Sequence, residues 1–110
     1  MSDVDAVVDQ LENDRAALAT MRLLIDPTTA GETALALLRR NDPLGVMFLL
    51  GGFENAGADT RSEIEDAATS YAADDAARAT LTHHLTMAQR ASDPRTARAA
   101  RELVTVISLP

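Results

Sequence analysis

Two histidines are the residues of this chain whose type most readily supports metal binding or acid–base chemistry, and they are adjacent, His83 and His84. Neighbouring side chains on a helix point about 100° apart, whereas a helical metal-binding pair has the i, i+4 spacing. Met87 follows His83 by four residues, but a thioether is a soft ligand, and spacing marks no further ligand. We therefore expect partly exposed helical histidines, with no metal and no cofactor.

Carboxylates gather at two places that could in principle hold a divalent ion or support acid–base catalysis. These clusters are Glu63, Glu65 and Asp66, and Asp74 and Asp75. Their spacing matches no calcium loop, and the chain has no Glu-x-x-His pair of the kind that helical di-iron proteins use. No serine stands in the glycine-flanked elbow of a nucleophile, and there is no cysteine. We predict solvated helical faces and no enzyme activity.

The composition predicts a single helical domain, 1–110. Apolar residues make up 46% of the chain but aromatic residues only 3%, so the core must consist of small aliphatic side chains, which suit packed helices better than a sheet. The longest apolar run, 46–50, is too short to span a membrane, and the N-terminal residues do not form a signal-peptide pattern. We expect a cytoplasmic protein, or alternatively one exported without a cleaved signal peptide.

All ten basic residues are arginines, and seventeen carboxylates bring the net charge to −7. This charge opposes attraction to nucleic acid or to an anionic membrane, so we expect a protein partner and no small-molecule ligand. Arg95, Arg98 and Arg101 form a basic ridge on the last predicted helix. Three arginines without neighbouring aromatics favour pairing with acids of this chain or of another subunit over docking on a phosphate backbone.

The apolar periodicity predicts an all-α compact bundle of about five helices with short Asp-Pro-capped or Thr-capped connections. The predicted helices are 3–25, a short helix opened by a Thr29-Ala30-Gly31-Glu32 capping box, the central apolar helix 43–56, the region 60–91, and a last helix from Asp93-Pro94. The region 60–91 forms one helix or two, because its apolar stripe weakens near Asp74.

The predicted central helix, 43–56, is apolar in every direction, which is stable only when neighbours cover all its sides. Asp42 and Pro43 are suited to its N-cap and first position. Gly45 and Gly52 lie seven residues apart and share a face, so we expect another backbone to approach closely there.

A heptad pattern in the predicted helix 3–25 forms a seam of the kind that packs along another helix. The seam consists of Val4, Val7, Leu11, Asp14, Leu18, Met21 and Ile25, with Asp14 as its polar interruption. Beside it, Asp5, Asp9 and Glu12 form an acidic face. The seam is either an interface between copies of the chain, with Asp14 setting the register, or the face that covers the central helix within one chain.

The segment Tyr71-Ala72-Ala73-Asp74-Asp75 resembles the Tyr-x-x-x-Asp/Glu export signal of actinobacterial type VII secretion substrates. The resemblance is confined to residues 71–81 and implies a small helical hairpin protein exported through Tyr71 and Asp75. The chain departs from the family pattern, because it has no tryptophan for the usual Trp-x-Gly turn and the signal does not lie near the chain end.

These observations leave four functions open. The first is a non-enzymatic interaction or assembly module that forms a homo-oligomer through the seam. The second is an acidic regulator or inhibitor that uses Asp5, Asp9 and Glu12 to bind a basic protein, with association that weakens in salt. The third is the type VII substrate that the resemblance implies, and the fourth is a structural subunit of a phage or of a larger complex.

Overall fold

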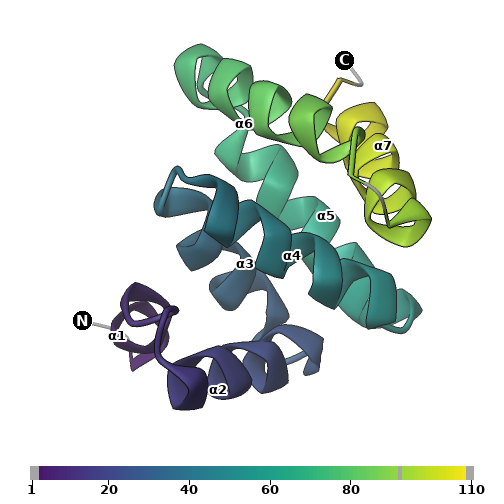
Figure 1. The fold of residues 1–110 in the computed structure, drawn as a ribbon. Helices are drawn as coiled ribbons and strands as arrows, with labels where there is room; N and C mark the ends of the chain where they lie inside the picture. Colours follow the sequence, from purple (N-terminus) through teal and green to yellow (C-terminus); the bar gives the residue numbers. More distant parts are fainter. Residues whose placement is uncertain (1–2, 92, 109–110) are drawn as a thin grey trace.

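The computed structural model describes residues 3–91 and 93–108, which form helices and short connections without any strand (Figure 1). The helices of these residues are α1 (Asp3–Asp9), α2 (Asp14–Ile25), α3 (Ala30–Arg39), α4 (Pro43–Asn55), α5 (Ala58–Tyr71), α6 (Asp75–Ala88) and α7 (Pro94–Ser108). The all-α prediction is confirmed, but the described residues contain seven helices where about five were predicted. The principal extents of 33 × 30 × 26 Å are nearly equal, so the fold is a compact globule and not an extended hairpin.

Two polar caps account for the additional helices. Asn13 breaks the predicted helix 3–25, because its side chain accepts a hydrogen bond from the backbone N–H of Arg15 at 2.9 Å and starts α2. Asp74 likewise accepts from the N–H of Ala77 at 2.9 Å and starts α6. The prediction of a single helix over 3–25 is therefore wrong, and the region 60–91 contains two helices.

The start of α3 also differs from the prediction. Thr29 makes no capping hydrogen bond to α3, and its hydroxyl donates instead to the carbonyl of Leu23 near the end of α2. Its backbone has helical angles (φ −118°, ψ −7°), whereas a residue at an N-cap has an extended backbone. The prediction that the Thr29 side chain caps this helix is therefore wrong.

Helix α4 lies at the centre of the fold and contacts α2, α3, α5, α6 and α7. As predicted, it begins at Pro43, and Asp42 caps it by accepting the backbone N–H of Gly45 at 2.8 Å. Leu49, Leu50 and Phe53 are almost fully buried. Met47, however, remains 45% exposed, so the prediction that neighbours cover every side of the helix is wrong. None of the described helices is both long and apolar enough to cross a membrane.

Two glycines allow α2 and α3 to pack closely against one side of α4, which we call its closed side. A Cβ atom on Gly45 would lie 2.6 Å from the carbonyl oxygen of Leu37 in α3. A Cβ atom on Gly52 would overlap the side chain of Leu24 in α2, which is completely buried. The predicted close approach of another backbone is thus confirmed at Gly45, whereas at Gly52 the close partner is a leucine side chain.

One arginine joins the corner between α1 and α2 to the start of α4. Arg40, whose side chain is only 11% exposed, donates to the carbonyl of Val8 at 2.8 Å and to Asp42 at 2.9 Å. It also pairs with Glu12 at 3.2 Å. The Val8 carbonyl belongs to the last turn of α1, where helix carbonyls lack partners within the helix, so Arg40 caps α1 from another element.

Candidate functional site

The predicted heptad seam is divided between the core and the surface. Val4 and Leu11 are buried, at 6% and 2% exposure, whereas Leu18 and Ile25 remain 55% and 44% exposed. The helix break at residues 10–13 changes the direction of the chain, and the heptad phase does not continue across it. The prediction of one continuous seam is therefore wrong, and we call its exposed remainder, Leu18 and Ile25, the α2 ridge.

The other seam residues have separate environments. Val7 is half-buried and lines a shallow hollow of about 360 Å³ between α1 and α2. Met21 is half-buried and lies within van der Waals distance of a Cβ atom placed on Gly51 of α4. Asp14 is exposed in the first turn of α2, so within this chain it is not a polar member of an interhelical seam.

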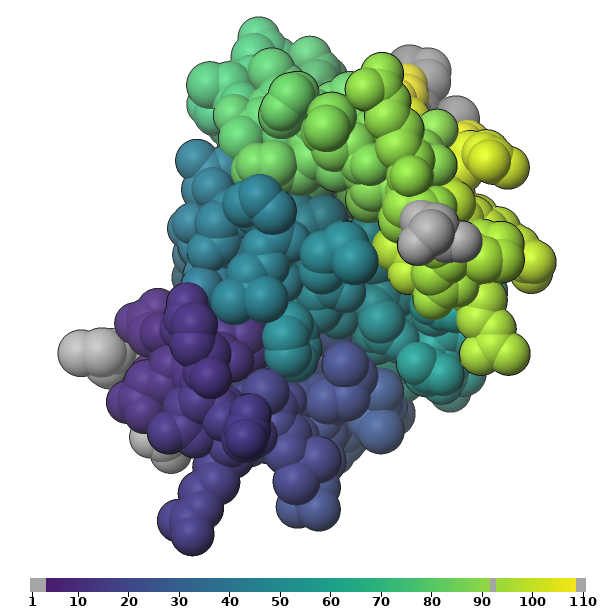
Figure 2. Space-filling model, viewed as in Figure 1, coloured from purple at the N-terminus to yellow at the C-terminus, as the bar shows by residue number. Residues whose placement is uncertain are grey.

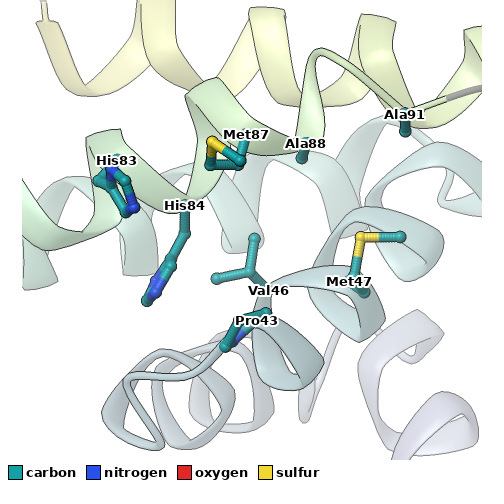
Figure 3. A pocket seen from close by; sticks show the side chains of 8 residues that line it. All are labelled: Pro43, Val46, Met47, His83, His84, Met87, Ala88 and Ala91. Atoms are coloured by element: carbon teal, nitrogen blue, oxygen red, sulfur yellow. The ribbon is translucent and has the colours of Figure 1, made fainter.

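A groove runs between α4 and α6, which we call the α4–α6 groove (Figure 3). It has a volume of about 420 Å³ and is lined by Pro43, Val46, Met47, His83, His84, Met87, Ala88 and Ala91. Met47 and Met87 are 45% and 51% exposed, although they belong to different helices. Most of the lining is apolar, so the groove can accept apolar side chains from another molecule.

The histidines lie at the Pro43 end of this groove. His83 is exposed, His84 is half-buried, and their ring centroids are 5.9 Å apart with the ring planes at 55°. Within the described part of the chain, no three residues among histidines and carboxylates are grouped so as to hold a metal ion. The histidines therefore form a polar end to an otherwise apolar groove.

Asp42 precedes Pro43 of the groove and interacts with His84, and this carboxylate is already engaged. Burial pushes the pKa of Asp42 upward, but hydrogen bonds from Arg40 and from the N–H of Gly45, together with the charges of Arg40 and His84, hold it below its usual value. A carboxylate fixed in this way serves as a helix cap and an ion-pair partner. It is poorly placed to act as a general base in the groove.

A second hollow, of about 220 Å³ between α4, α5 and α7, is ionic. Arg61 lies 4.4 Å over the ring of Phe53, donates to the Phe53 carbonyl at 3.0 Å and pairs with Glu102 at 3.1 Å. From the predicted basic ridge, Arg95 lies 3.8 Å from Glu54 and Arg98 lines the same hollow, while Arg101 is exposed. Two of the arginines in this hollow, Arg61 and Arg95, are therefore paired with carboxylates of the same chain.

The residues of the predicted export signal lie on either side of a helix break. Tyr71 is the last residue of α5 and packs half-buried against the core, whereas Asp75 is the first residue of α6 and pairs with Arg78 at 2.8 Å. The globular fold also differs from the helical hairpin that the resemblance implies. On the predicted acidic face, Asp9 is exposed and Asp5 is half-buried, but Glu12 is committed to Arg40.

Sequence reasoning did not identify the α4–α6 groove. The sequence showed that Met87 and His83, four residues apart, share a face of one helix. Nothing in the sequence placed these residues beside Met47. The α2 ridge and the groove together hold the large apolar side chains that are exposed in the described chain. Figure 2 shows the helices of the two surfaces, α2 and α6, at opposite ends of the molecule. No protein-family model, curated protein or solved structure matches this chain.

Proposed function

We propose that this protein is a non-enzymatic assembly module that associates with copies of itself through apolar contacts. The observation that carries the proposal is the α2 ridge, where Leu18 and Ile25 remain half-exposed on the outer face of a helix whose Thr20 and Leu24 are buried. Grouped apolar side chains on a surface often mark a protein interaction site. The ridge is the exposed remainder of the seam for which the sequence left an interface between copies of the chain as one of two alternatives.

An apolar contact is favoured over an electrostatic one by the pairing of the charged residues. Glu12 is bound by Arg40, which leaves the acidic face with fewer charges for a basic partner. Arg95 lies near Glu54, so the basic ridge is partly neutralised by its own chain. A regulator that relied on charge would present these groups unpaired, because steering depends on the uncompensated field.

The test is the solution mass of the purified protein across concentration, measured by light scattering at low and high salt. The weight-average mass should rise with concentration and should not fall in high salt, because salt screens charges and leaves apolar contacts intact. The Leu18→Glu variant should weaken association about 30-fold, the size expected for an interface hot spot.

The matched control is Ser62→Glu, which adds the same charge at an exposed position of α5. It should associate as the unmodified protein does. A protein that remains monomeric at every concentration would remove the proposal. Association of Leu18→Glu with unchanged affinity would exclude the ridge as the contact surface.

A further inference from the structure

We infer that the face of α6 formed by His83, His84 and Met87 binds a soft monovalent metal ion, Cu⁺. All three residues belong to α6 and line the same groove. Met87 follows His84 by three residues and His83 by four, and residues at these two spacings are neighbours on a helix surface, with Cβ atoms about 5–6 Å apart. Two imidazoles and one thioether are therefore grouped on one helix, in an arrangement that does not depend on self-association.

The two imidazoles are close enough to share one ion. Their ring centroids lie 5.9 Å apart, although adjacent side chains leave a helix in directions about 100° apart. Two imidazoles that bind one metal ion through nitrogen atoms about 2 Å from it have centroids about 5–6 Å apart. Neither ring has a hydrogen-bond partner among the described residues. Their ring nitrogens are therefore available as ligands.

The thioether of Met87 completes the ligand set and determines the class of metal. This side chain is 51% exposed, and its three rotatable bonds let the sulfur move toward the histidines. Soft thioether sulfur selects Cu⁺, and imidazole also suits copper. Zn²⁺ is bound by thiolate, imidazole or carboxylate, and Mg²⁺, Ca²⁺ and Mn²⁺ by oxygen ligands. The ligands on α6 therefore favour Cu⁺ over these ions.

Hard oxygen ligands are missing from this face. No carboxylate belongs to the residues that line the groove. Asp42, beside the same end, accepts hydrogen bonds from Arg40 at 2.9 Å and from the N–H of Gly45 at 2.8 Å. The described chain holds no group of three histidines and carboxylates that suits a metal ion, but the site on α6 is of another kind because one ligand is a thioether.

The charges near the histidines favour a cation. Arg40 is paired with both Glu12 and Asp42, so these three groups together carry one excess negative charge. Asp42 also interacts electrostatically with His84. The whole chain has a net charge of −7, which raises the concentration of cations near its surface.

The second exposed methionine of the groove provides a matched control. Met47 is 45% exposed, close to the 51% of Met87, but it belongs to α4. Figure 3 shows Met47 toward the Ala91 end of the groove, away from the histidines. Met87 is therefore a ligand of the proposed site and Met47 is not.

The experiment adds Cu⁺ to the protein under anaerobic conditions, at one fixed protein concentration. NMR spectroscopy follows the ¹³C-labelled methyl groups of the methionines. One equivalent of Cu⁺ should shift the Met87 signal and leave the Met47 and Met21 signals in place, because only Met87 supplies a ligand. Competition with a coloured Cu⁺ chelator then gives the affinity, and an equal concentration of Zn²⁺ should not displace the ion.

Three variants test the individual ligands. Met87→Leu keeps the volume of the side chain but removes the sulfur, and His83→Gln removes an imidazole. Each should weaken Cu⁺ binding at least about 10-fold, since even the loss of a group that only orients a ligand weakens metal binding by about this factor. Met47→Leu should bind Cu⁺ as the unmodified protein does. Circular dichroism checks that each variant is folded.

Three results would overturn the inference and leave the proposed function in place. If the unmodified protein takes no Cu⁺ from the chelator at any concentration, α6 has no site. Equal affinities of Met87→Leu and Met47→Leu would show that the Met87 thioether is not a ligand. Displacement of Cu⁺ by an equal concentration of Zn²⁺ would show that the site is not selective for a soft ion. Self-association is measured separately, by light scattering without copper.

Discussion

Helix α4 packs against α2 and α3 on one side and faces α6 across a groove on the other, and the two sides differ in how much space they leave (Figure 1). On the closed side, Gly45 and Gly52 admit a carbonyl oxygen and a leucine side chain to positions that any Cβ atom would fill. On the open side, Met47 lies exposed beside a hollow of about 420 Å³.

The difference indicates which side of α4 contributes most to the packing of the fold. An apolar helix is stable in water only when its faces are covered. Glycine lets the closed side reach contact distance, whereas on the open side Ala91 and the exposed Met47 line a groove. Substitutions on the closed side should therefore lower the free energy of unfolding most, and substitutions on the open side should lower it least.

The largest effect is expected on the closed side at Leu24, which is fully buried in the space that Gly52 leaves. Leu24→Ala should lower the free energy of unfolding by about 2–5 kcal/mol, because it removes packed methyl groups and leaves a cavity. Urea denaturation followed by circular dichroism measures this loss. A loss below about 1 kcal/mol would mean that this side is not closely packed.

Two adjacent glycines sharpen the comparison. Gly52→Ala should cost about 1–3 kcal/mol, because its methyl group would overlap Leu24 in a filled core. Gly51→Ala should be neutral or stabilising by up to about 1 kcal/mol, since its methyl group would have only the Met21 methyl in ordinary contact at 3.6 Å and helical glycine is entropically costly.

A double variant tests whether Leu24 is the cause of the Gly52 effect. In a Leu24→Ala background, Gly52→Ala should lose most of its cost, because the overlapping atoms are absent. Denaturation of the four proteins in this cycle gives the coupling free energy. Additive losses would show that the Gly52 effect arises from something other than the contact with Leu24.

Arg40 supports the closed side from outside the core by holding α1 to the start of α4. Arg40→Met should lower the free energy of unfolding by about 1–2 kcal/mol, because hydrogen bonds to Val8 and Asp42 are lost. Hydrogen exchange should accelerate mainly in α1. Arg39→Met, at the exposed position directly before Arg40, is the control and should change neither quantity.

A smaller loss in the free energy of unfolding is expected at low pH. The pKa of folded Asp42 is below its usual value, so the stability it contributes is fully present above the usual carboxyl pKa of about 3.9 and is lost as pH falls through the lowered value. The loss should stay below the approximately 1 kcal/mol of a whole N-cap. Asp42→Asn keeps the cap and should flatten this part of the pH profile.

The smallest change in stability is expected on the open side. Met47→Ala should change the free energy of unfolding by less than about 1 kcal/mol, because nearly half of the Met47 side chain already meets solvent. A loss of stability as large as that of Leu24→Ala would mean that the two sides of α4 are not different.

The parts of the fold that the sequence predicted depend on local backbone chemistry. Proline and the residue before it have restricted backbones, so the end of α2 at Asp26-Pro27 and the start of α4 at Asp42-Pro43 were both predicted. Glycines that share a helical face likewise predicted the close approach at Gly45 and Gly52.

The parts that failed depend on contacts between distant residues. The heptad from Val4 to Ile25 is the same whether or not Asn13 caps a new helix, and the bent form is held by Arg40, which reaches Val8 from 32 residues away. The α4–α6 groove depends on the distance between two helices, and no local sequence pattern around Met47 or Met87 determines that distance. The residues were therefore visible in the sequence, but their arrangement was not.

The most direct test of self-association through the α2 ridge is an NMR experiment. The spectrum of the protein, labelled with ¹³C at its methionine methyl groups, is recorded across concentration. We predict that the signal of Met21, which lies one turn from both Leu18 and Ile25 on α2, shifts or broadens as the mass rises. An unchanged Met21 signal during association would contradict the proposal that the α2 ridge is the contact surface.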